Sequence, residues 1–193
     1  MTTTREVEAA LNQAAGEDQR ILFFVALLRK EAGLGLDDIV VVGGSAIELY
    51  TEGSYVSGDI DICAPREPLA TALAAWGFKR PGREWARLDW RVVLDIVGRF
   101  PSGSMRHTRV LDTPYGSVRV GAVEDLIVRR LALVKFWNEP QEYQNARLLI
   151  ALPGLDWEYL SETADREGVA EVLTELRREF GSERKKSRRR RKT

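Results

Sequence analysis

The chain has 193 residues, of which 44% are hydrophobic and 30% are charged, a balance that suits a folded domain with its own core and argues against a disordered chain. Its single cysteine, Cys63, excludes an internal disulfide and a thiolate zinc site. No apolar run approaches the roughly 18 residues that cross a bilayer, and the first residues lack the apolar core of an export signal. We therefore expect a cytoplasmic protein with no membrane partner.

The net charge of zero hides an uneven distribution. Eight of the 29 basic residues and one of the 29 acidic residues lie in 183–193, which leaves the rest of the chain at about −7. A basic run of this kind repels itself, so 183–193 is predicted to be a disordered tail. The tail can add salt-dependent affinity for nucleic acid, or it can serve solubility alone, and both interpretations stay open.

The first predicted elements are a helical segment and a buried strand. Residues 5–33 are expected to be helical because apolar side chains recur at the spacing of one helix face. The β-branched run over 38–42 predicts a strand, which stops at Gly43 and Gly44. Ser45 is a natural N-cap, so it is expected to open the next helix.

Two later strands carry acidic residues. The segment 58–63 alternates polar and apolar residues, which predicts a half-buried strand with Asp59 and Asp61 on one face. A second strand is predicted over 90–97, with Asp95 inside an apolar run. The other elements predicted in this half are a helix over 67–76 and a strand pair over 108–111 and 116–120.

The rest of the chain is predicted to be helical. Expected helices cover 122–137, 140–152, 156–166 and 168–180. The predicted fold class is α/β (α+β), with a mixed sheet flanked by helices. The predicted parts are an α/β core with N-terminal helices over 1–121, a helical region over 122–182 and the basic tail over 183–193.

The Gly-Gly-Ser turn indicates an anion site. Glycines let the backbone approach a bulky anion, and the helix that follows directs N–H groups and the positive end of its dipole toward it. A triphosphate is the expected ligand. As an alternative, Gly43, Gly44 and Ser45 form only a turn between a strand and a helix.

The aspartates indicate a metal site. Asp59 and Asp61 repel each other unless a cation lies between them, and Mg²⁺ prefers hard oxygen ligands. Asp95 would complete a three-carboxylate cluster, and Asp89 is a weaker candidate for that third position. Two Mg²⁺ ions held in this way can stabilise the attacking and leaving oxygens of a phosphoryl transfer.

Together these motifs resemble the nucleotidyltransferase superfamily that includes DNA polymerase beta, and most closely its minimal bacterial group related to abortive-infection and toxin–antitoxin nucleotidyltransferases. In that group a Ser or Thr stands two residues before the first Asp, as Ser57 does here, and an Arg often stands where this chain has Tyr55. Its helical half carries basic residues at places that Arg129 and Lys135 roughly match. The resemblance implies nucleotide-binding roles for Gly43, Gly44, Ser45, Ser57, Arg129 and Lys135, and catalytic and metal-binding roles for Asp59, Asp61 and Asp95.

The resemblance implies an enzyme that moves a nucleoside monophosphate from ATP or another nucleoside triphosphate to an acceptor hydroxyl. The acceptor would be RNA, in particular tRNA, or a protein side chain, and a cognate toxin or antitoxin would be a partner in a toxin–antitoxin or phage-defence system. The alternative is a catalytically silent protein of this fold that binds nucleotide, RNA or a partner protein. Tyr55 and the degenerate acidic stretch at 141–144 motivate that alternative.

Overall fold

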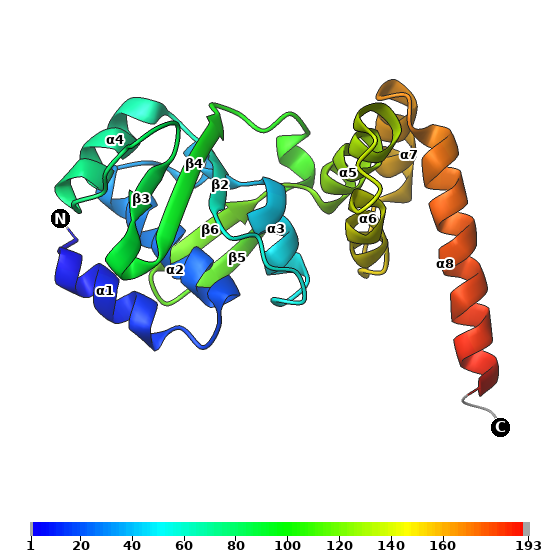
Figure 1. The fold of residues 1–193 in the computed structure, drawn as a ribbon, viewed down its shortest axis with the longest axis horizontal. Coiled ribbons are helices and arrows are strands. Elements are labelled where there is room, and N and C mark those ends of the chain that lie inside the picture. The colour runs from blue at the N-terminus through cyan, green and yellow to red at the C-terminus, as the bar shows by residue number, and fades with distance from the viewer. Residues whose placement is uncertain (1, 191–193) are drawn as a thin grey trace. The chain divides into compact units, whose positions relative to one another are not determined.

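The computed structural model describes residues 2–190, with side chains described through Gly181. Contacts divide the chain into a first unit that ends at Ala122 and a second that begins at Val123 (Figure 1). The first unit is a six-stranded mixed sheet flanked by helices, which confirms the prediction of a mixed α/β fold. The second unit is made of helices.

The first unit contains four helices, six strands and three short 3₁₀ segments within the described residues. The helices are α1 (Thr4–Gln13), α2 (Glu17–Glu31), α3 (Gly43–Tyr50) and α4 (Arg66–Ala75), and the 3₁₀ segments are η1 (Leu36–Asp38), η2 (Leu88–Trp90) and η3 (Met105–His107). The strands are β1 (Val40–Val41), β2 (Ile60–Cys63), β3 (Trp85–Arg87), β4 (Val92–Gly98), β5 (Arg109–Thr113) and β6 (Gly116–Val120).

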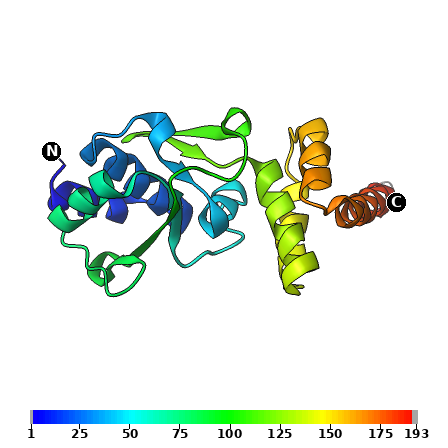
Figure 2. The same ribbon diagram turned by 90° about the horizontal axis from the view of Figure 1, so that it is seen from above.

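The strand order is β3-β4-β2-β1-β6-β5. The central strand β1 pairs antiparallel with β2 and parallel with β6, while β2 runs parallel to β4. Antiparallel partners close both edges, β3 beside β4 and β5 beside β6. Figure 2 shows the same unit from above, where the β5–β6 hairpin is the green pair of arrows. This order places β2 and β4, which carry Asp61 and Asp95, side by side.

Three predicted elements of this unit differ in the structure. The helical segment 5–33 is two helices, because the backbone is extended at Ala14, which ends α1, and at Gly16, the N-cap of α2. The strand predicted over 38–42 shrinks to β1, because 36–38 turn as η1. Helix α3 begins at Gly43 with Val42 as its N-cap, so the prediction of Ser45 as N-cap is wrong.

The core of the first unit contains a cluster of four aromatic side chains. Phe24 of α2, Trp76 after α4, Phe78 and Trp90 lie with ring centroids 5.6 to 6.4 Å apart. Each of these side chains is at most 5% exposed. The Trp76 indole N–H donates to the Thr2 carbonyl at 3.0 Å, which ties the N-terminal segment to this core.

The second unit contains α5 (Val123–Trp137), α6 (Glu142–Ile150), α7 (Trp157–Arg166) and α8 (Ala170–Arg190). Its core is aliphatic, with Leu131, Leu149, Leu160 and Leu176 fully buried. Residues 183–190 of the predicted tail continue the backbone of α8, and 191–193 lie outside the described residues. In the part of the chain that is described, no helix is long and apolar enough to cross a membrane.

Candidate functional site

The Gly43–Gly44 turn lies directly against Asp61. Gly43 adopts a φ of +60°, and a β carbon placed on it would lie 2.2 Å from the Asp61 Oδ2 atom. The Gly44 backbone N–H donates to the same oxygen at 3.1 Å. Only glycine fits at position 43, both for its backbone conformation and for this close approach. The Gly43–Gly44 turn and the Asp61 carboxylate of β2 thus pack directly against each other.

Ser45 joins α3 to β2. Its hydroxyl donates to the Asp59 carbonyl at 2.8 Å and accepts from the Asp61 N–H at 2.8 Å, and the side chain is fully buried. Both hydrogen bonds belong to the backbone of the Asp-Ile-Asp segment. Ser45 therefore fixes the position of the two aspartates, and this internal bonding is a role that the sequence did not indicate.

Ser57 is held by a buried glutamate of α3. Its backbone N–H donates to the Glu48 Oε2 atom at 2.8 Å, and its hydroxyl lies 2.8 Å from that oxygen and 2.9 Å from the Asp59 carbonyl. Glu48 is only 2% exposed, and no side chain or backbone group of the described residues bonds to its Oε1 atom. The sequence did not single out Glu48, although this residue fixes Ser57 in the segment that leads into β2.

Asp61 and Asp95 are partners in the register of the parallel strands β2 and β4. Aligned residues of neighbouring strands project from the same face of a sheet, so the two carboxylates share one face. Asp95 is 6% exposed. Asp59 precedes β2, outside the paired residues. The structure thus brings together two of the three predicted carboxylates.

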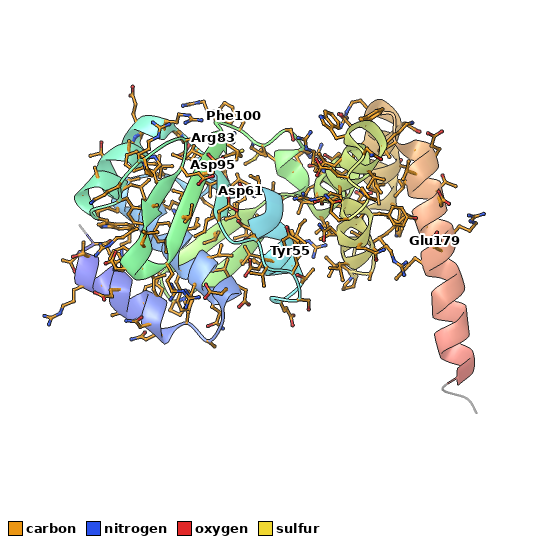
Figure 3. All side chains as sticks on the ribbon, in the orientation of Figure 1. Tyr55, Asp61, Arg83, Asp95, Phe100 and Glu179 are labelled. Atoms are coloured by element: carbon orange, nitrogen blue, oxygen red, sulfur yellow. The ribbon has the colours of Figure 1, made fainter. Side chains whose placement is uncertain are left out.

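Arg83 contacts the second of these carboxylates. Its Nε atom donates to Asp95 Oδ1 at 3.2 Å, and its Nη2 atom lies 2.5 Å from Asp95 Oδ2. Figure 3 shows Asp95 between Asp61 and Arg83. Hydrogen bonding to Asp95 raises the pKa of the Arg83 guanidinium. No spacing or pattern in the sequence indicated Arg83, which lies in an exposed stretch before β3.

The predicted three-carboxylate metal cluster does not form as a group in this structure. Within the described residues, no three His, Cys, Asp or Glu side chains gather closely enough to hold a metal ion. Asp89, the other candidate for the third position, lies in η2 and pairs with Arg87 at 3.0 Å, which lowers its pKa through the hydrogen bond. Asp95 is therefore the better partner of Asp61.

Cys63, at the end of β2, is a buried thiol. It is 5% exposed, and burial raises its pKa to about 11. A thiol needs to ionise to act as a nucleophile or a metal ligand, so this cysteine serves packing.

The two basic residues predicted to bind nucleotide lie in the second unit. The Lys135 ammonium donates to the Gly168 carbonyl at 2.8 Å and pairs with Glu171 at 2.6 Å. Arg129 is exposed, and its guanidinium lies 5.8 Å from the centre of the Trp137 ring. Lys135 therefore already holds α5 to the start of α8, while Arg129 remains accessible.

Comparison with known proteins gives no relative, because no family model, no curated protein and no solved structure matches the chain.

Proposed function

We propose that the protein is a Mg²⁺-dependent nucleotidyltransferase that moves a nucleoside monophosphate from a nucleoside triphosphate to an acceptor hydroxyl. The observation that carries this proposal is the pairing of Asp61 with Asp95 on adjacent parallel strands, beside the glycine turn that opens α3. A metal-bound triphosphate needs groups that attract its cation and groups that attract its phosphates. Here the carboxylates would attract the cation, and the N-terminus of α3 would attract the phosphates.

The donor chemistry at this face fits Mg²⁺. The ion commonly takes one or two carboxylates and completes its six oxygen ligands with water and substrate phosphates. Asp61 and Asp95 would hold it, with Asp59 as a further carboxylate on the approach to β2. When bound, Mg²⁺ supplies charge neutralisation at the transferring phosphoryl group.

In the proposed reaction the acceptor hydroxyl oxygen bonds to the α-phosphorus. The bond from that phosphorus to the oxygen shared with the β-phosphorus breaks, and pyrophosphate leaves. The proton of the hydroxyl passes to the Asp95 carboxylate, which acts as a general base after Arg83 has moved from its oxygens. The first turn of α3 would attract the phosphates through the positive end of its dipole, with the Gly44 N–H released from Asp61 to bond to them.

A second candidate is a protein that binds nucleotide without turnover. Two observations favour it. Arg83 places a positive charge on Asp95 where a metal ion would otherwise neutralise that carboxylate. The Tyr55 hydroxyl lies 3.3 Å from where a β carbon on Gly44 would stand, so it occupies space over the turn. A protein whose site is occupied in this way would keep the fold and bind nucleotide without catalysing the transfer.

Label transfer separates the two candidates. The full chain is incubated with Mg²⁺, each α-labelled nucleoside triphosphate in turn, and total bacterial RNA and protein. Asp61→Asn and Asp95→Asn remove one carboxylate each, while Asp89→Asn, at an exposed aspartate of η2, is the matched control. A transferase labels RNA or protein, retains that activity in Asp89→Asn, and loses at least about a hundredfold in the other two variants.

The products identify the acceptor. Label that ribonuclease releases indicates an RNA or tRNA acceptor, and label that protease releases indicates a protein acceptor. Saturable binding of Mg²⁺ and nucleotide with no transfer from any of the four triphosphates supports the binding protein instead. The role in toxin–antitoxin or phage defence, and a cognate toxin or antitoxin partner, remain predictions.

A further inference from the structure

A pocket of about 320 Å³ opens in the first unit, and Asp59 but not Asp61 lines it. Its walls come from α2, α3, the segment before β2, and the junction of η2 with β4. This volume lies at the lower end of the range typical of small-molecule sites. Ser57 and Asp59 of the sequence motif line it, while its remaining walls come from residues that no motif singled out.

Part of the pocket wall is apolar, and two of its lining residues are exposed hydrophobic side chains. Ile21, Ile60 and Val92 line the interior and are at most 7% exposed. At the rim, Val56 is 69% exposed and Leu88 is 78% exposed. A compact apolar group between Val56 and Leu88 would remove both side chains from water, which is favourable in proportion to the area covered.

Charged residues in the pocket lining are either paired or unpaired. Glu17 pairs with Arg20 at 3.1 Å and with Arg91 at 3.3 Å. Arg20 also donates to the carbonyls of Leu11 and Trp90. The carboxylates of Glu48 and Asp59 line the same pocket, and among the described residues neither belongs to an ion pair. These two carboxylates are therefore the charged groups of the lining that a cation could still pair with.

Glu48 is the most informative group in the pocket. Its Oε2 atom receives the hydrogen bonds of Ser57, but its Oε1 atom is buried and has no partner in the described structure. A buried carboxylate oxygen without a donor is costly, so such groups in native proteins usually have a ligand, ion or water nearby. Here the unsatisfied oxygen belongs to a residue that lines a pocket.

We propose that this pocket binds a small organic cation, an ammonium or amidinium group on a compact apolar body. The positive group would lie toward Glu48 and Asp59, and the apolar body would pack between Val56 and Leu88. A buried negative charge is stabilised when a positive group with N–H donors pairs with it. The proposal does not depend on the transfer reaction, because binding can be measured without any nucleotide.

The first test compares charged probes with neutral ones of the same shape. Phenethylammonium and benzamidinium are titrated into the full chain by calorimetry, with 2-phenylethanol and benzamide as their neutral counterparts. We expect saturable binding of a charged probe with a dissociation constant of about 1 mM, a value reasonable for ligands of this size. The neutral counterparts should bind at least about tenfold more weakly, since they cannot neutralise the carboxylates.

Two variants then locate the binding. Glu48→Gln keeps an acceptor for Ser57 and removes the charge, so it should weaken the charged probes about tenfold. Leu88→Ala changes an exposed rim residue and should weaken them about threefold through lost apolar contact. Glu67→Gln, an exposed glutamate at the start of α4, is the matched control and should change nothing.

Three results would overturn the proposal. They are no saturable binding of either charged probe, equal binding of charged and neutral probes, and unchanged binding in both Glu48→Gln and Leu88→Ala. Circular dichroism confirms that each variant is folded. Should Glu48→Gln fail to fold, Leu88→Ala and the pairs of probes still decide the question.

Discussion

Arg83 and Asp95 form a two-point ion pair between the exposed loop before β3 and the middle of β4. The arginine side chain is 67% exposed, while the aspartate side chain is 9% exposed. A solvent-exposed arginine therefore neutralises a carboxylate that is almost buried. The same carboxylate is the register partner of Asp61. Any divalent cation that binds this pair has to compete with the guanidinium.

Replacing Arg83 should therefore strengthen metal binding. In Arg83→Gln the two carboxylates lose their competing cation, and we expect the affinity for Mn²⁺, used as a spectroscopic substitute for Mg²⁺, to rise about three- to tenfold. Electron paramagnetic resonance of free Mn²⁺ measures this. The control is Arg80→Gln in the same loop, where Arg80 contacts the Arg83 carbonyl and lies near Trp85. An equal rise in both variants would point to general charge rather than to the ion pair.

Gly43 should be among the least replaceable glycines of the chain. In Gly43→Ala the new methyl group would overlap Asp61, and the backbone would be held at a positive φ, so we expect unfolding free energy to fall by about 3 kcal/mol or more. Gly53→Ala tests the backbone effect alone, because Gly53 has a φ of +76° and open space around it. That control should lose only about 1 kcal/mol in urea denaturation. Similar losses in both variants would contradict the close packing of Asp61 on Gly43.

Ser45→Ala should destabilise the segment that carries the aspartates. The change removes the hydroxyl that bonds to both the Asp59 carbonyl and the Asp61 N–H, and the carbonyl keeps its contact with the Ser57 hydroxyl. We therefore expect a loss of about 1 to 3 kcal/mol. Ser161→Ala is the control, since Ser161 is exposed and its hydroxyl donates only to a carbonyl of its own helix. The control should change unfolding free energy by less than about 0.5 kcal/mol. A comparable effect of the two substitutions would mean that the hydrogen bonds of Ser45 contribute little.

The contact of Lys135 with Glu171 predicts a pH dependence. The hydrogen bond from Lys135 lowers the pKa of Glu171, so the folded protein is stabilised at pH values above the pKa that this glutamate has in the unfolded chain. This contribution is lost as the pH falls through the lowered folded pKa. Lys135→Gln should therefore be less stable than the wild type in urea at pH 7, and the difference should shrink toward pH 3.

The control for this prediction is Lys79→Gln, an exposed lysine that has no ion pair among the described residues. Its stability relative to the wild type should not change with pH in this range. A difference for Lys135→Gln that is the same at pH 7 and pH 3 would assign the effect to the hydrogen bond from Lys135 to the Gly168 carbonyl instead.

Local patterns predicted the elements whose residues repeat regularly. Alternation around Asp59 and Asp61 indicated β2, and the apolar run around Asp95 indicated β4. Strand β3 was missed, because its three residues, Trp85–Arg87, are all half-buried and show no alternation. Strand β3 forms by pairing with β4 at the edge of the sheet. Such pairing depends on the assembled sheet, so local sequence does not indicate it.

The candidate site was predicted as a set of residue types, while its contacts were not. The register that sets Asp61 beside Asp95 depends on strand pairing over more than thirty residues of sequence. Arg83 reaches Asp95 only because the loop before β3 returns over β4. Glu48 lies in the middle of a short helix, and nothing in its sequence context distinguishes it from a surface residue. Its burial and its hydrogen bonds with Ser57 appear only in the folded chain. Each of these relationships arises from tertiary contacts.

The two residues of β1 have a consequence for how the chain is made. Val40 and Val41 pair on one side with β2, about twenty residues later. Their partner on the other side is β6, some eighty residues further along the chain. On the ribosome, the face with Asp61 and Asp95 can therefore assemble while the opposite edge of β1 still lacks its neighbour. During that interval two valines at an open strand edge are available to another nascent chain, and chaperone protection would matter most until Val120 has emerged.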